Sequence, residues 1–426
     1  MKLPHMRVSQ QLREHLFRFG ILIGILALMT GIGFLVEHRG NLFTTLADSA
    51  NPMQKYADQI IKTCSSESYP PSCYDKEIPK LMDKGITMEQ AFEVTRLIQN
   101  KVNNYYYCHV LGHELAAKET AKDPSKWTEV IGRCPTGMCS NGCLHGAAQE
   151  RFRSDVLTSD QVDGILPQLA QICQPGHERS FTGLEQASCY HALGHLSMYL
   201  TGADVPHSIA ICNQIAKPSG QDYTQTCYEG VYMQIFQPLE PEDFALVKDI
   251  PAKTIPDAEK LCDTFTGEQR AACHRESWPL YRQQLETPTG LTHFCSLVNN
   301  PTDVQRCYNA MFYVLTAQFN FDESKIVPLC LGLPDPKRQA QCFGNSASRF
   351  LETDYRLGPR AVGLCKIADQ HGYGDRCYSE LLFYSSFNYH EGSPEFQQIC
   401  NDMPEPWRGK CLAGEGKNTQ PSQHDF

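Results

Sequence analysis

The sequence lacks the short motifs that mark several common classes of catalytic site. His-Glu-x-x-His, Gly-x-Ser-x-Gly, the phosphate-binding loop and the dinucleotide-binding fingerprint are all missing. Their absence argues against a zinc protease of that class, an α/β-hydrolase and an enzyme that binds a nucleotide through these loops. His113-Glu114 resembles the start of the zinc-protease motif, but no second histidine follows at the required spacing.

The motif for covalently attached haem is missing as well. Cys-x-x-Cys-His does not occur, and Cys139-x-x-x-Cys143-Leu144-His145 does not match its spacing. Haem of the c type is therefore excluded. Haem held between two facing histidines needs no such motif and remains a secondary alternative.

Positive charge is scarce. The chain has 38 Lys and Arg against 48 Asp and Glu, for a net charge of −10, and no basic run follows the N-terminus. Proteins that bind nucleic acid neutralise phosphates with Lys and Arg, so the composition predicts no nucleic-acid partner. The acidic surplus is most simply a solvated surface.

Cysteine, in contrast, is abundant. The twenty cysteines are even in number and regularly spaced, which favours a disulfide framework in an oxidising compartment. From Cys134 onward they form the pairs 134/143, 173/189, 212/227, 262/273, 295/307, 330/342, 365/377 and 400/411. Cys108 and Cys139 fall outside this series. They either pair with each other, which we favour, or leave Cys108 as a thiolate beside the histidines.

The second cysteines of the later pairs recur every 34 or 35 residues, at 273, 307, 342, 377 and 411. A period of this size is typical of helical-hairpin repeats. The sequence therefore predicts an all-α fold: a disulfide-stapled helical-hairpin repeat solenoid or toroid. We divide it into His-rich repeats (61–240) and regular Cys-paired repeats (241–413), followed by a disordered tail (414–426).

The N-terminus predicts a membrane anchor. Residues 19–36 form an uncharged, apolar run near the lower length limit for a transmembrane helix. The basic residues of segment 1–18 place it in the cytoplasm by the positive-inside rule, and a tether (37–60) leads to an exported, periplasmic domain. A cleaved signal peptide is the competing interpretation.

One histidine motif occurs twice. His109-Val110-Leu111-Gly112-His113 and His191-Ala192-Leu193-Gly194-His195 both read His-x-x-Gly-His, and Cys143-Leu144-His145-Gly146 lies between them. On a helix, residues four apart share a face, so each full motif directs two imidazoles the same way. The glycine removes the side chain that would block close approach of a ligand or another helix.

The repeats themselves indicate that these histidines are not needed for folding. Two residues after the second cysteine, the early repeats have His145, His191 and Glu229, whereas the later ones have Arg275, Asn309, Gly344 and Ser379. Equivalent positions of stacked repeats line one surface. We therefore predict a single transition-metal site (Zn, Cu or Fe) with the ligands His109, His113, His145, His191, His195 and Glu229.

Three further carboxylates are candidates for proton transfer or for supporting the ligands: Glu114, Glu150 and Glu185. The alternative is that the histidines are partly buried structural residues, hydrogen-bonded to Tyr105, Tyr106 or Glu114.

The favoured function is that of a membrane-anchored, exported helical repeat protein with a multi-histidine transition-metal site. The sequence leaves open whether it is an enzyme; in an enzyme, the metal would activate water or dioxygen for a small molecule or peptide. The rival is a non-catalytic scaffold of the cell envelope that binds a protein or glycan. A metal-trafficking or storage protein ranks third, because Met198 and Met233 are few methionines for copper handling.

The anchor hypothesis predicts that the mature protein keeps residues 1–36. The basic flank retains the N-terminus in the cytoplasm, and no small-x-small cleavage site adjoins the apolar run. N-terminal sequencing of the membrane fraction checks this. A cleaved signal peptide would instead give a mature N-terminus at about residue 40–50.

Overall fold

The computed structural model describes residues 51–102, 105–152, 157–174, 180–217, 221–239 and 241–418. Within these ranges all regular secondary structure is helical, which confirms the predicted all-α class. No helix in the described ranges is long and apolar enough to cross a membrane. The predicted cytoplasmic segment (1–18) and anchor (19–36) lie outside the described residues, so both remain predictions.

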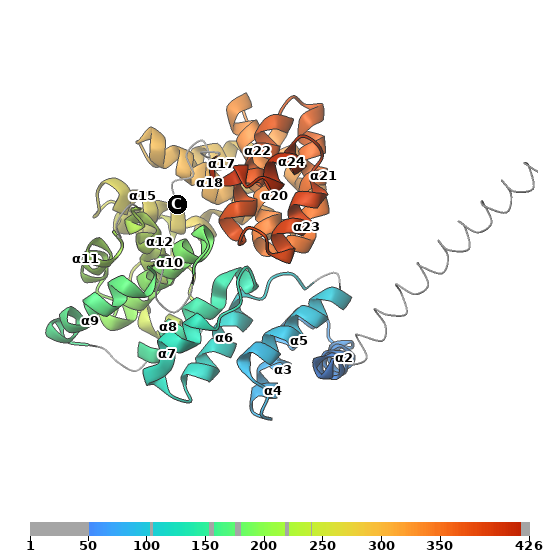
Figure 1. Ribbon diagram of the computed structural model, residues 1–426. Helices are drawn as coiled ribbons and strands as arrows, with labels where there is room; N and C mark the ends of the chain where they lie inside the picture. The colour runs from blue at the N-terminus through green and yellow to red at the C-terminus, as the bar shows by residue number, and fades with distance from the viewer. Residues whose placement is uncertain are drawn as a thin grey trace, which may run out of the picture.

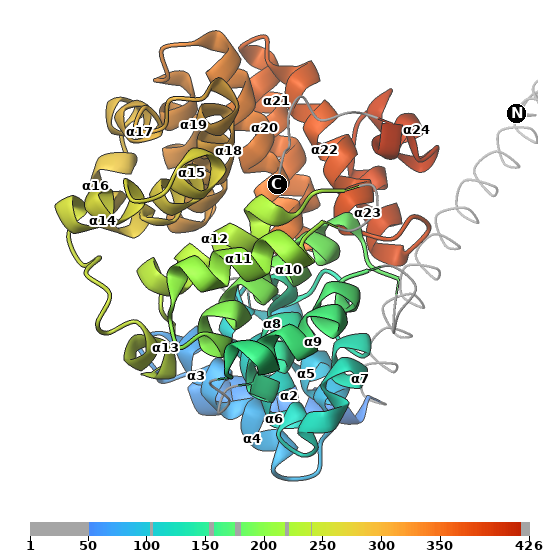
Figure 2. The same cartoon turned by 90° about the vertical axis from the view of Figure 1, so that its left-hand side faces the viewer.

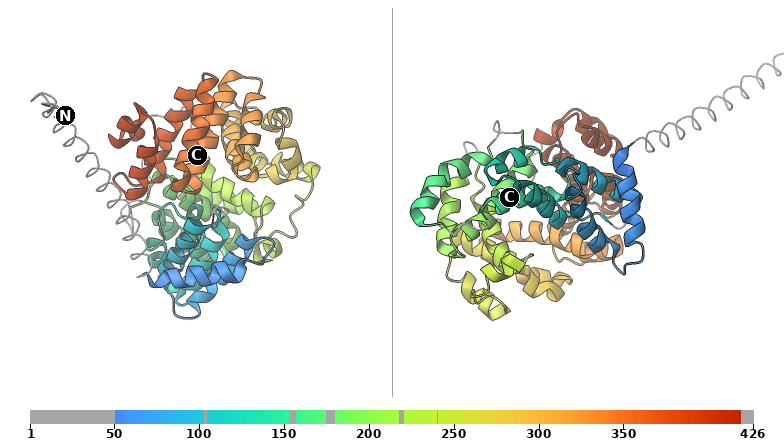
Figure 3. Two further views of the ribbon diagram at one scale, coloured as in Figure 1. Left: turned by 90° about the vertical axis from the view of Figure 1, so that its right-hand side faces the viewer. Right: turned by 90° about the horizontal axis from the view of Figure 1, so that it is seen from below.

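The described chain begins with helices that precede the first cysteine-paired hairpin. They are α2 (Pro52–Cys64), α3 (Pro70–Glu77), α4 (Pro79–Met82), α5 (Met88–Lys101) and α6 (His109–Thr120). Thr87 and Gln90 form the predicted capping box of α5. Because α5 ends at Lys101, the first histidine motif lies on a helix of its own, α6. Figure 3 shows α2, in blue, at the outer edge of the molecule.

The predicted tether is shorter than the sequence indicated. Residues 52–60 belong to α2, whose N-terminus is capped by the side chain of Asn51. Ala57 and Ile60 are buried in the core, which explains why this segment is helical rather than a free linker. The predicted tail also begins later, because the turn η5 (Glu415–Asn418) contacts α22 (Gly374–Asn388). Residues 419–426 lie outside the described chain.

The rest of the described chain is a succession of helix pairs. In order, the first and second helices of each pair are α7 (Trp127–Gly132) and α8 (Gly142–Phe152), α9 (Ser159–Ile172) and α10 (Gly183–Leu200), α11 (Val205–Ile215) and α12 (Thr224–Phe236), α14 (Ile255–Cys262) and α15 (Gly267–Glu276), α17 (Pro288–Cys295) and α18 (Pro301–Gln318), α19 (Glu323–Leu331) and α20 (Pro336–Thr353), α21 (Gly358–Gln370) and α22, and α23 (Pro394–Asp402) and α24 (Trp407–Leu412). The shorter elements are η1 (Pro124–Lys126), η2 (Cys139–Asn141), α13 (Pro241–Leu246), η3 (Trp278–Tyr281), α16 (Arg282–Leu285) and η4 (Tyr355–Leu357).

A disulfide joins the two helices of every pair, as predicted. The bonds are 134–143, 173–189, 212–227, 262–273, 295–307, 330–342, 365–377 and 400–411. Cys108 and Cys139 also pair, which confirms the favoured alternative for these two residues. Cys64 and Cys73 form a further bond in the N-terminal region. No described cysteine is left free.

The second helices of successive pairs pack on one another. The contacts run from α8 to α10, α12, α15, α18, α20 and α22, and α6 packs on α8 (Figure 1). α22 also contacts α10, and η2 contacts α20. The C-terminal pairs therefore return to the helices that carry the histidines. In Figure 2, α10 and α12 lie between the blue N-terminal helices and the orange C-terminal helices.

Buried apolar side chains form two clusters. The first includes residues between Met53 and Cys273, and the second includes residues between Tyr281 and Cys411. The proposed boundary between residues 240 and 241 falls inside the first cluster. Core packing thus changes over about one repeat after the proposed boundary.

Glycines allow the histidine-bearing helices to touch backbone to backbone. A Cβ atom added to Gly142 or Gly146 on α8 would overlap the carbonyl oxygen of His109 or His113 on α6. A Cβ on Gly230 of α12 would likewise overlap the carbonyl oxygen of His191 on α10. The motif glycines behave alike: a Cβ on Gly194 would overlap the carbonyl oxygen of Cys227 on α12, and one on Gly112 would lie 3.1 Å from the backbone nitrogen of Cys143 on α8. Of the ligand or helix expected to approach the motif glycine, the structure shows a helix.

This packing predicts that Gly230→Ala destabilises the oxidised protein by about 1–3 kcal/mol, because the methyl group must push α10 and α12 apart. Gly363→Ala is the matched control, since Gly363 also lies inside a helix and has open space at its Cβ position. That substitution should be neutral or stabilise by about 0.5–1 kcal/mol. Chemical denaturation measures both, and equal effects would contradict the packing argument.

Candidate metal centre

Three neighbouring helices bring the five predicted histidines together. His109 and His113 lie one turn apart on α6, His145 lies on α8, and His191 and His195 lie one turn apart on α10. The ring centroid of His145 is 5.0 Å from that of His109 and 5.2 Å from that of His113. It is also 5.7 Å from the ring of His191 and 5.8 Å from that of His195. His145 thus occupies the middle of the cluster.

His109, His113 and His145 form the most compact group. One ring nitrogen from each lies within 4.8 Å of the others, so the group could hold a metal ion. All three residues are buried, with exposed fractions of 8%, 8% and 6%. The Nε2 atoms of His109 and His113 are 3.1 Å apart. Two nitrogens bound to one tetrahedral metal at about 2.0–2.1 Å lie about 3.3 Å apart, so this spacing fits shared coordination.

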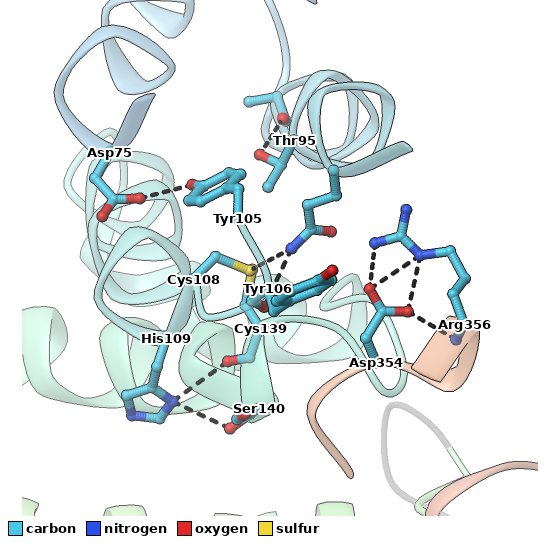
Figure 4. Close-up of a disulfide and its surroundings, with 12 residues drawn as sticks. Asp75, Thr95, Tyr105, Tyr106, Cys108, His109, Cys139, Ser140, Asp354 and Arg356 are labelled. Carbon is cyan, nitrogen blue, oxygen red and sulfur yellow. Dashed lines mark hydrogen bonds and ion pairs between the residues drawn. A yellow bond between two sulfur atoms is a disulfide. The ribbon is translucent and has the colours of Figure 1, made fainter. Parts of the chain in front are cut away.

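The orientation of His109 is set by the turn that precedes α8. Its Nδ1 atom lies 3.3 Å from the carbonyl oxygen of Cys139 and 3.1 Å from that of Ser140 (Figure 4). Cys139, Ser140 and Asn141 all have positive φ angles, of 51°, 44° and 58°. Such backbone costs about 1–3 kcal/mol per residue, and the Cys108–Cys139 bond helps to hold it in place.

These contacts determine which nitrogens can act as ligands. A carbonyl oxygen only accepts, so Nδ1 of His109 carries the proton and Nε2 is left with a free lone pair. His145 is turned the other way, because its Nε2 donates to the carbonyl oxygen of Ser188 at 3.1 Å. Its Nδ1 is therefore the available ligand atom. Hydrogen bonds of this kind are the usual support for metal-binding imidazoles.

His191 and His195 form a second close pair. Their Nε2 atoms are 3.2 Å apart, and Nδ1 of His195 donates to Oε1 of Gln234 on α12 at 2.7 Å. Both imidazoles are only partly buried, in contrast to those of His109, His113 and His145. Sδ of Met233, also on α12, lies 3.3 Å from Nε2 of His191.

Burial keeps the imidazoles neutral. Desolvation lowers the pKa of His109 to about 4, although hydrogen bonds to the carbonyls of Ser140 and Cys139 act in the opposite direction. Desolvation is also the main cause that lowers the pKa of His145, His191 and His195. Neutral imidazole is the form that binds metals, so near neutral pH no proton must leave these rings before a metal binds.

A cavity of about 680 Å³ adjoins the second pair. Its lining includes His191, Met233, Glu276, Trp278 and Arg349, together with several tyrosines and phenylalanines. Desolvation, followed by the nearby charge of Glu229, raises the pKa of Glu276 to about 8. This carboxyl group therefore carries a proton at neutral pH.

The predicted carboxylates do not join the histidines in the described contacts. Glu229 accepts a hydrogen bond from Arg275 of α15 and forms an ion pair with it. Glu185 caps α10 through Thr182, while Glu114 is exposed and Glu150 half-buried. The alignment of the repeats placed Glu229 at a position equivalent to His145 and His191. It could not show that Arg275 on the next helix, α15, would pair with this carboxylate.

The hydrogen-bond partners expected for structural histidines also differ. The hydroxyl of Tyr105 donates to Asp75, and the backbone carbonyl of Tyr106 accepts from Gln99. The described polar contacts of the imidazoles go instead to backbone carbonyls, to the Gln234 amide, to the Met233 sulfur and to one another.

Several functional candidates were not predicted from the sequence. Ser140 and Gln234 orient imidazoles, Glu276 faces the cavity, and the buried carboxylate of Asp243 accepts from Gln149. Gln234 follows Cys227 by seven residues, which places it on the helix next to the second histidine motif. The repeat alignment therefore offered a signal for Gln234, but none for the other three residues.

Comparison with protein-family models, with curated proteins and with solved structures finds no match to this chain.

The buried imidazoles predict that the metal-free protein loses stability as the pH falls from about 6.5 to 4. Above the unfolded pKa of about 6.5, histidine is neutral in both states and contributes no pH dependence. Below pH 6.5 the histidine binds a proton in the unfolded chain, whereas His109 in the folded chain, with its pKa of about 4, stays neutral. Proton binding therefore favours the unfolded chain. The loss is about 1.4 kcal/mol per pH unit for such a group.

Denaturation of chelator-treated protein at pH 7.5, 6.0 and 5.0, compared with the His109→Gln variant, measures this contribution. The variant should show a shallower loss between these values. Identical pH slopes would mean that His109 titrates alike in the folded and unfolded chains.

Proposed function

We propose that the chain is an exported, membrane-anchored metalloprotein that binds a transition metal through His109, His113 and His145. The observation that carries this proposal is the convergence of three buried imidazoles whose ring nitrogens lie within 4.8 Å of one another. Three protein nitrogens leave one position of a tetrahedral ion open to an exogenous ligand. An all-imidazole donor set suits Zn, Cu or Fe.

Export to an oxidising compartment is supported by the cysteines. All ten disulfides lie within the described chain, and such density is unusual for a cytosolic protein. The apolar run at 19–36 would provide the anchor, with residues 1–18 in the cytoplasm and the helical domain in the periplasm.

The proposed architecture is a hairpin repeat array closed into a toroid. Each disulfide-joined pair packs its second helix on the next, and α22 reaches back to α10. Stacked repeats of this kind place equivalent positions on one inner surface. The cluster of imidazoles on α6, α8 and α10 is what such stacking would produce.

The cavity supports a role in small-molecule chemistry. His191 and Met233 contribute to its wall, so a molecule in the cavity would lie against the imidazole cluster. The aromatic lining favours a mainly apolar small molecule or peptide segment. A metal here could activate water or dioxygen, and the protonated Glu276 carboxyl is the proton carrier that the cavity itself offers.

The metal proposal predicts that His113→Ala reduces bound metal at least about tenfold. The full-length protein, purified oxidised and reconstituted separately with Zn, Cu and Fe, is analysed for metal by elemental mass spectrometry. The melting temperature is measured with and without chelator. Metal should stabilise the parent but not the variant, because metal bound only to the folded state shifts the unfolding equilibrium.

His293→Ala and His371→Ala are matched controls, since both histidines are exposed on the later repeats. They should leave metal content unchanged. A parent protein that takes up no metal after reconstitution would contradict the proposal and favour a non-catalytic envelope scaffold. The proposal would also be contradicted if His113→Ala kept its full metal content but lost stability equally with and without chelator. That outcome would identify His113 as a structural histidine.

A further inference from the structure

The Nε2 atoms of His191 and His195 face each other, and the contacts of His195 fix the proton on its ring. Nδ1 of His195 donates to the Oε1 oxygen of Gln234. A neutral imidazole carries one proton, so Nε2 of His195 is left with a bare lone pair. Nε2 of His191 lies against this lone pair and against Sδ of Met233.

Nitrogen atoms of two imidazoles can converge in this way on a shared metal ion. The Nε2 atoms of His191 and His195 are only 3.2 Å apart. This spacing is close to the edge of about 3.3 Å between two nitrogens that share a tetrahedral metal. The pair is therefore arranged as two ligands of one ion.

Met233 adds a third donor of a different kind. Its Sδ atom lies 3.3 Å from Nε2 of His191, and the residue forms part of the cavity wall. Thioether sulfur is a soft ligand that favours Cu(I), whereas Zn and Fe sites are built mainly from nitrogen, oxygen and thiolate. A pair of imidazoles with a thioether thus differs in chemistry from the all-imidazole group on α6 and α8.

The geometry points to a second metal subsite, formed by Nε2 of His191, Nε2 of His195 and Sδ of Met233, that takes Cu(I). This inference rests on the proposed metal-binding function and divides the five histidines between two ions. His145 stays with His109 and His113, because one ring nitrogen from each of these three residues lies within 4.8 Å of the others. The second subsite is the one in contact with the cavity.

The position of the two subsites predicts different exposure. His109, His113 and His145 are buried, whereas His191, His195 and Met233 are all half-buried. An ion at the second subsite would therefore be open to small molecules from the cavity. The ion at the first would be enclosed by α6 and α8.

Copper titration of the oxidised, full-length protein tests the inference. The protein is first loaded with Zn. Cu(I) is then added as a complex with a competing chelator that stabilises the reduced ion and leaves disulfides intact. The number of Zn and Cu ions per chain is measured. The parent should hold one Zn and one Cu. His195→Ala should lose Cu and keep Zn, whereas His113→Ala should lose Zn and keep Cu.

Met233→Leu isolates the thioether. It should weaken Cu(I) binding at least about tenfold and leave Zn binding unchanged. X-ray absorption should show a copper–sulfur distance in the parent that disappears in this variant. Met198→Leu is the matched control, because Met198 is fully buried on α10, the helix that carries His191 and His195. That substitution should alter neither metal.

The other outcomes separate the two proposals. In one outcome, the parent binds one ion per chain that His113→Ala loses and that His195→Ala and Met233→Leu both keep. This outcome overturns the second subsite and leaves the proposed function intact. One ion lost in either histidine variant means a single shared site. It also overturns the division. Zn binding without Cu(I) binding indicates a shared proton between His191 and His195. No metal in the parent overturns both proposals.

Discussion

The candidate site depends on backbone contact between helices. Gly142 and Gly146 lie against the carbonyl oxygens of His109 and His113, and Gly230 lies against that of His191. The backbone of each of these histidines therefore lies directly against a glycine of a neighbouring helix. Any side chain at the glycine would move the helix axes apart and change the distances between rings on different helices. The same contacts leave the imidazoles little water, which is why burial lowers the pKa of His109 and His145.

Much of the fold could be predicted because its strongest signals are local. Cysteines that close short loops can be paired by spacing, and the predicted hairpin disulfides and Cys108–Cys139 are all present. Histidines four residues apart on a helix must share a face, so the clustering of the imidazoles followed from the repeat. The fate of Glu229 could not be predicted, since its pairing with Arg275 depends on the rotation of α15. Gln234, Met233 and Glu276 depend in the same way on how α12 and α15 turn toward the cavity. The start of α2 at Pro52 depends on tertiary burial of Ala57.

The later repeats show what the same inner positions do without histidine. Asn309 follows Cys307 by two residues, as His145 follows Cys143, and it accepts hydrogen bonds from Gln341 and from Asn345, the latter at 2.8 Å. Its neighbourhood is thus polar but built from amides, which hydrogen-bond to one another and offer a metal only weak ligands. Polar interiors therefore occur in both halves of the described chain. Among the described residues, convergent imidazoles occur on α6, α8 and α10.

The bond between Cys108 and Cys139 links the chemistry of the compartment to the shape of the site. It joins the residue before His109 to the left-handed turn whose carbonyls hold that imidazole. Until the two thiols are oxidised, no covalent bond holds this costly turn against the start of α6. For the proposed metal site an order of assembly follows. If the chain is exported as proposed, the reduced chain in the cytosol would offer an incomplete set of ligands, and the set would be completed only after translocation and oxidation. The metal would then be chosen from the pool outside the cytoplasm.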